Sequence, residues 1–106
     1  MPKYVLAYHG GSMPETDAEK AEVMQAWGAW MGGLGDALID PGNPVGQSAT
    51  VKADGSVAQD GGANPLSGYS LLSADSQEAA IKAASGCPIL QRGGTVEIAE
   101  TFDIPM

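Results

Sequence analysis

The sequence predicts an α+β fold in which two β-α-β halves form one antiparallel sheet with both helices on the same face. Two observations predict the halves: residues 3–9 and 68–74 are strand-like runs, and each is followed by a helix-capping signal. A third observation predicts a hairpin between the halves, because Asp54 and Gly55 separate two short alternating segments. The predicted order is strand, helix, strand hairpin, strand, helix, strand.

The first half begins with residues 3–9, whose high β propensity and stop at Gly10 predict a strand. Thr16 and Glu19 have the spacing of a capping box, so a helix is expected to begin there. Its apolar stripe recurs at spacings of three or four: Met24, Trp27, Met31, Leu34 and Leu38, widened by Val23 and Trp30. The stripe predicts a main-core helix that ends at the turn cluster 40–44.

The rest of the chain is predicted to contain a hairpin, a surface loop and a second strand-helix-strand unit. Segments 48–53 and 56–58 are expected to pair as a hairpin, and residues 59–67 have the composition of a surface loop. After the strand at 68–74, Asp75 and Glu78 form a second capping-box pattern. Gly86 and Pro88 then end the helix, and residues 95–102 alternate as a final strand.

Both faces of the predicted sheet are largely apolar or mixed. The first strand has Tyr4, Leu6 and Tyr8 on one face and Val5, Ala7 and His9 on the other. A ferredoxin-like sandwich covers only one face with its helices, so the second face needs another cover. We therefore expect a homodimer in which two sheets pack face to face.

Length and charge restrict the protein classes. A chain of 106 residues has room for one domain, 1–106, with one core. Thirteen acidic and 5 basic side chains give a formal charge of −8, and the basic residues form no stripe. Nucleic acid and anionic membranes are therefore not expected as partners. The acidic chain shows no signal-peptide pattern and no membrane-length apolar run, so the expected location is the cytoplasm.

Several segments together resemble the YCII-related family over nearly the whole chain. They are residues 4–9, the helix with Trp27 and Trp30, and residues 50–55, 68–76, 87–88 and 94–97. The resemblance implies a single YCII-related domain that forms a dimeric α/β barrel. Many relatives, often called the DGPF branch, continue after the hairpin with Asp-Gly-Pro-Phe, whereas this chain has Asp60, Gly61, Gly62 and Ala63. Other relatives carry a His on the first helix, which is absent here, so no activity is carried over.

Three residues are candidates for catalysis: His9, Glu97 and Asp60. His9 is the only histidine, and imidazole suits proton transfer near neutral pH, although a lone His at a strand end is also typical of a polar rim. Glu97 interrupts an apolar strand. It is expected to face solvent at an edge, to act as a pocket acid, or to pair with Lys52 or Arg92.

Five further residues are candidates for ligand binding: Tyr8, Trp27, Trp30, Lys52 and Tyr69. The aromatic ones could equally form plain core, because aromatic residues at helical or strand spacing usually pack inside. No ligand spacing for a metal ion and no cofactor fingerprint occurs, so neither a metal nor a cofactor is predicted. The single Cys87 cannot form an internal disulfide and is interpreted as a packed side chain.

Three classes of function remain open from the sequence. The first is a cofactorless enzyme acting on a small polar organic molecule, with His9 as acid or base and Tyr8, Asp60 or Glu97 orienting the substrate. The second is a dimeric small-molecule binder or sensor without turnover. The third is an interaction module that uses its acidic surface to bind a protein partner.

Overall fold

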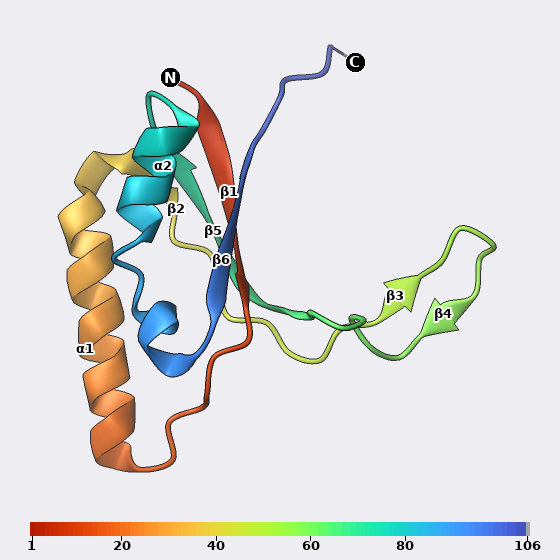
Figure 1. Ribbon diagram of the computed structural model, residues 1–106, viewed down its shortest axis with the longest axis horizontal. Helices are drawn as coiled ribbons and strands as arrows, with labels where there is room; N and C mark the ends of the chain where they lie inside the picture. The colour runs from red at the N-terminus through yellow and green to blue at the C-terminus, as the bar shows by residue number, and fades with distance from the viewer. Residues whose placement is uncertain (106) are drawn as a thin grey trace.

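A computed structural model describes residues 1–105 as an α+β domain with one four-stranded antiparallel sheet. The central strand β1 (Lys3–His9) pairs with β5 (Leu66–Ser73) on one side and with the edge strand β6 (Thr95–Glu100) on the other. The short strand β2 (Leu38–Asp40) pairs with β5 and forms the second edge. The order is thus β2-β5-β1-β6 (Figure 1). This sheet is open, and the chain alone does not close into a barrel.

Two α-helices and two 3-10 helices accompany the sheet. Helix α1 spans Asp17–Leu34 and continues into the 3-10 helix η1 (Gly35–Ala37), whereas α2 spans Gln77–Ala84 and is followed by η2 (Pro88–Arg92). Side chains of α1 and α2 pack against the same cluster of buried strand residues. Both helices therefore lie on one face of the sheet, side by side (Figure 1).

The core lies between this sheet face and α2. Strand alternation buries Tyr4, Leu6 and Tyr8 of β1, and they pack with Ala80 and Ala84 of α2. The small alanines let α2 approach the sheet closely. The rest of the buried core is formed by Leu72, Ala74, Cys87 and Ile89.

Helix α1 contacts this core through aromatic side chains and buries no residue completely. Trp27 and Trp30 stand edge to face with Tyr8, with ring centroids 5.2 and 6.5 Å away, respectively. The Trp30 indole N–H also donates a hydrogen bond of 3.0 Å to the Ala83 carbonyl, which joins α1 to α2. The stripe was predicted to be main core, yet Met24 is 75% exposed. The predicted stripe therefore meets the core only in part: Trp27, Trp30 and Leu34 pack against it as partly buried residues.

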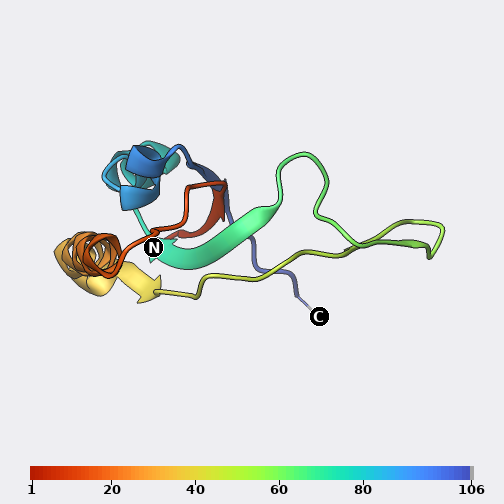
Figure 2. The same cartoon turned by 90° about the horizontal axis from the view of Figure 1, so that it is seen from below.

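The predicted hairpin forms, but it does not join the main sheet. Strands β3 (Thr50–Val51) and β4 (Val57–Ala58) pair only with each other, and they extend away from the body of the domain (Figures 1 and 2). The second strand of the main sheet is instead Leu38–Asp40. Gly35, with a positive φ of 56°, ends α1 at Leu34, so Leu38, the last member of the predicted helical stripe, lies four residues beyond the helix and begins β2. We call residues 45–63 the arm.

The helix caps confirm one prediction and correct another. Thr16 Oγ1 accepts the Glu19 N–H at 3.0 Å, which is the first half of the predicted capping box. The Glu19 carboxylate accepts the N–H of Glu15 at 3.2 Å, one residue before the cap, rather than that of Thr16. At α2 the cap is Ser76, whose hydroxyl oxygen accepts the Ala79 N–H at 3.1 Å. Asp75 was predicted to cap this helix, but the helix begins one residue later. The last strand likewise ends at Glu100, before Phe102.

We predict that Trp30→Ala lowers the free energy of unfolding by about 3 kcal/mol, because it removes a large packed ring together with its indole hydrogen bond to the Ala83 carbonyl. Urea unfolding measures the change. The matched control on the same helix is Met24→Ala, where an exposed side chain is truncated and the change should stay within about 0.5 kcal/mol. Equal losses in the two variants would contradict this account of α1.

Candidate functional site

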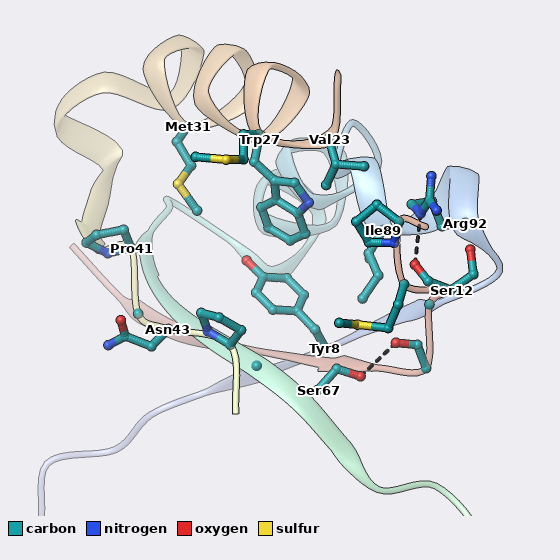
Figure 3. Close-up of a pocket in the computed structure, with 18 of the residues that line it drawn as sticks. Tyr8, Ser12, Val23, Trp27, Met31, Pro41, Asn43, Ser67, Ile89 and Arg92 are labelled. Carbon is teal, nitrogen blue, oxygen red and sulfur yellow. Dashed lines mark hydrogen bonds between the residues drawn. The ribbon is translucent and has the colours of Figure 1, made fainter. Parts of the chain in front are cut away.

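A cavity of about 530 Å³ lies between α1 and one end of the sheet (Figure 3). Helix α1 forms one wall, and residues 41–44, which follow β2, form the opposite wall. Residues 10–14 and two residues of η2 close the end near the start of α1. The side chains that give the lining its apolar character are Tyr8, Met13, Val23, Met24, Trp27, Met31 and Ile89.

Glycine on α1 helps to create this space. Met24, Gly28 and Met31 lie on one face of α1, since residues three and four apart are neighbours on a helix. A Cβ added at Gly28 would meet no atom within 4 Å. Gly28 is therefore a notch in the apolar stripe, and the cavity extends into it.

The opposite wall depends on a close backbone approach. Gly42 has a φ of 68°, and a Cβ at this position would overlap the Tyr69 carbonyl oxygen. Backbone hydrogen bonds attach this segment to β5, with the Tyr69 N–H donating to the Asn43 carbonyl at 3.3 Å and the Val45 N–H donating to the Ser67 carbonyl at 2.9 Å. Only glycine at 42 lets this wall lie so near the sheet.

Tyr8 forms the floor of the cavity. Its hydroxyl donates to Ser70 Oγ at 2.7 Å, and the Ser70 hydroxyl donates in turn to the Pro41 carbonyl at 2.7 Å. This chain of two hydrogen bonds connects the sheet to the wall at residue 41. Burial raises the pKa of Tyr8 to about 12, so its phenol is neutral at physiological pH. The phenol proton is used in the hydrogen bond to Ser70.

Arg92 is the only charged residue among those that line the cavity. Its Nε donates to the Ser12 carbonyl at 2.8 Å, which holds the guanidinium beside the loop before α1 (Figure 3). One Nη atom lies 3.6 Å from a Glu19 carboxylate oxygen. The end of the cavity near Ser12 therefore carries a positive charge.

His9 and Glu97 meet on the other face of the sheet. His9 Nε2 lies 3.0 Å from Glu97 Oε1, and Nδ1 lies 3.0 Å from the Asn64 carbonyl and 3.3 Å from that of Pro65. Because carbonyl oxygens only accept, Nδ1 is the donor, and a doubly protonated ring can also donate to the carboxylate. The histidine thus ties β1, β6 and the chain entering β5 together.

This pair lies outside the cavity lining. Strand alternation points Tyr8 toward the helices and His9 to the opposite face. Glu97 is at an edge, with 69% of its side chain exposed, as one sequence interpretation expected. Glu97 pairs with His9, and not with Lys52 or Arg92 as the alternative interpretation expected.

The remaining candidates are scattered. The Asp60 carboxylate accepts the Gly62 N–H at 3.0 Å within the arm, and Lys52 lies at the tight turn of the same arm. Tyr69 alternates with the buried Ser70 on β5 and contributes its backbone to the wall contact. Of the eight residues selected from sequence, only Tyr8 and Trp27 line the cavity, while Trp30 packs beside them at 5.6 Å from Trp27.

Sequence reasoning missed the residues that shape the cavity, above all Gly28, Arg92 and the wall at 41–44. A signal was present in α1, because a glycine between two methionines on one helix face indicates a notch. Arg92 was considered only as a partner of Glu97. Its position at the cavity follows from η2, whose place in the fold no local pattern indicates.

Cys87 is a packed thiol, and burial raises its pKa to about 11. Within residues 1–105, no group of three or more His, Cys, Asp or Glu side chains could hold a metal ion. In that same part of the chain, no helix combines the length and apolar character that crossing a membrane requires.

Comparison of the chain with protein-family models, curated proteins and solved structures finds no match. The resemblance to the YCII-related family therefore stays a prediction.

We predict an alkaline transition that belongs to Tyr8. Its pKa in the folded state, about 12, lies above the unfolded value of 10.0, so its contribution to stability is complete below pH 10 and is lost as the pH rises toward 12. Urea unfolding of the wild type and of Tyr8→Phe between pH 8 and pH 12 measures this dependence. The wild type should lose stability more steeply above pH 10 than the variant, and parallel curves would contradict the assignment.

Proposed function

We propose that this protein binds a small, largely apolar organic molecule in the cavity between α1 and the sheet, without converting it chemically. The observation that carries the proposal is a preformed apolar cavity whose lining contains neither His nor Asp nor Glu. Its volume of about 530 Å³ is in the range of small-molecule sites. The thioethers of Met24 and Met31 adapt readily to a ligand's shape and interact well with aromatic rings.

The positions of the polar candidates favour binding over catalysis. A general acid or base must come within hydrogen-bond reach of the substrate. His9 and Glu97 lie on the opposite sheet face, and Asp60 lies in the arm. Tyr8 lines the cavity, but its raised pKa keeps the phenol protonated. A ligand in the cavity would therefore meet recognition groups rather than proton-transfer groups.

The structure also supports a homodimer as the form of this binder, with each protomer a ferredoxin-like sandwich. The strand order β2-β5-β1-β6 and the two helices on one face are compatible with that fold. The second face carries Val5, Ala7 and Ala99 beside the pair of His9 and Glu97, and no helix within residues 1–105 covers it. The radius of gyration, 15.2 Å, exceeds the roughly 13 Å of a compact chain of this length because the arm extends outward.

Apolar residues on the extended segments support the same proposal. Val51 and Val57 in the arm are 74% and 53% exposed, and Phe102 after β6 is 79% exposed. Large apolar side chains that are exposed together with an uncovered sheet face offer a surface that another chain can cover. A second copy of this chain offers the same apolar surface in a self-complementary arrangement.

Gly28→Leu should abolish ligand binding without unfolding the protein, because the leucine side chain enters the empty notch. The probe is neutral naphthalene-2-carboxamide, and binding is followed by calorimetric titration. Replacing a helical glycine also removes a propensity penalty of about 1 kcal/mol, so the free energy of unfolding should not fall. We expect the affinity to drop at least tenfold.

The matched control is Gly32→Leu on the same helix, where a Cβ also meets no atom within 4 Å but where the residue does not line the cavity. This variant should bind the amide like the wild type. Equal binding by Gly28→Leu and Gly32→Leu would refute the proposed function, and so would a wild type that binds neither this amide nor the corresponding naphthalene-2-carboxylate.

Light scattering should report twice the 10.8 kDa mass of the chain. Ala99→Arg, on the uncovered face, should shift the protein toward monomer, because each protomer would place an arginine in the interface and the two like charges would repel. Ala29→Arg, at an exposed position on α1, should leave the mass unchanged. A monomer mass that does not vary with concentration in the wild type would rule out the dimer.

A further inference from the structure

Resting on the proposed binding function, we infer the chemical class of the ligand: an amphipathic monocarboxylate, with an apolar body against Trp27 and Met31 and its carboxylate on Arg92. The cavity has unlike ends (Figure 3). Arg92 and Ser12 lie at one end, and Met31 and Pro41 lie at the other. A molecule with one charged end and one apolar end would bind in a single orientation, with its charged end at Arg92.

The Arg92 guanidinium is held in place and still has donors to offer. Its hydrogen bond to the Ser12 carbonyl uses the Nε atom, and the side chain is only 26% exposed. The contact from Nη2 to Glu19, at 3.6 Å, is longer than a direct N–H···O hydrogen bond. The Nη atoms therefore remain free to form the paired hydrogen bonds by which arginine recognises a carboxylate.

Glu19 competes weakly for this cation. Its carboxylate already accepts the Glu15 N–H just before α1, and its side chain is 43% exposed. An ion pair of this length at a solvent-accessible position contributes little. A ligand carboxylate in direct contact with Arg92 would form shorter, charge-assisted hydrogen bonds and displace the contact with Glu19.

The charge of the whole chain limits how much negative charge the ligand carries. With a formal charge of −8, the protein repels anions on average, and Arg92 supplies a single positive charge at the cavity. One carboxylate matches one guanidinium. A dianion such as a phosphate monoester would bring a second charge that no lining residue neutralises.

The apolar end favours a flat body. Trp27 stands edge to face with Tyr8 at an interplanar angle of 81°, so the two rings form a corner. Met24 and Met31 flank Gly28 on the same wall and place thioethers near that corner. An aromatic ring or a compact apolar chain can contact both the rings and the sulfur atoms there.

The test compares two probes with the same body: naphthalene-2-carboxylate and the neutral naphthalene-2-carboxamide. Calorimetric titrations at pH 7 and one ionic strength give the ratio of their affinities. We expect the wild type to bind the carboxylate about tenfold more tightly than the amide. Arg92→Gln should bring this ratio close to one, because the guanidinium is lost.

Two further variants separate local contact from overall charge. Glu19→Gln keeps the capping hydrogen bond but removes the competing charge, so carboxylate binding should tighten severalfold. Lys20, next to Glu19 on α1, does not line the cavity. Lys20→Gln removes its positive charge and should leave the ratio of the carboxylate and amide affinities unchanged.

Each outcome has a distinct meaning. Equal affinities for carboxylate and amide in the wild type would overturn this inference and leave the proposed binding function standing. A preference for the carboxylate that persists in Arg92→Gln, or that falls in Glu19→Gln, would also overturn it. If the wild type bound neither probe, the proposed function would fail together with the inference.

Discussion

The edge-to-face contact between Tyr8 of β1 and Trp27 of α1 is the interaction on which the rest of this structure depends. The rings span the gap between helix and sheet, so α1 is supported without lying flat on the strands. Trp30 extends the same cluster to α2 through its hydrogen bond to Ala83. From Tyr8, the hydroxyl chain through Ser70 reaches the wall at Pro41. One aromatic cluster thus positions both walls of the cavity.

This arrangement separates two kinds of chemistry on the two faces of the sheet. The helix face holds the apolar cavity, with Arg92 at one end and a neutral phenol as its floor. The opposite face holds His9 and Glu97 in contact with each other and with the chain entering β5. The residues best suited to proton transfer therefore act as a structural tie, and the groups around the cavity are suited to recognition.

Local signals in the sequence predicted much of the fold. Strand β1, the capping box at Thr16 and the order of β5, α2 and β6 follow from patterns within a few residues of one another. The sequence predicted that the hairpin joins the main sheet, whereas Leu38–Asp40 is the strand that does so. This strand was missed because Leu38 continues the spacing of the helical stripe. Whether a two-residue strand pairs with the main sheet or only with its neighbour depends on tertiary contacts.

The site was less predictable than the fold. The contact between His9 and Glu97 joins residues 88 positions apart, and it requires the β1–β6 register that places Ala7 opposite Glu97. The cavity depends on absences of side chains at Gly28 and Gly42 as much as on the aromatic residues present. The glycines can be read from the sequence, but the empty space beside them depends on how the helix and the sheet are placed in the fold.

Diffraction from crystals equilibrated with xenon tests the central claim most directly, because xenon enters apolar cavities of this kind. The account predicts xenon density bounded by Trp27, Met31 and the notch at Gly28, with the Tyr8 and Trp27 ring centroids near 5.2 Å. A structure in which α1 lies directly on the sheet, with Trp27 turned outward and no xenon beside Gly28, would contradict it.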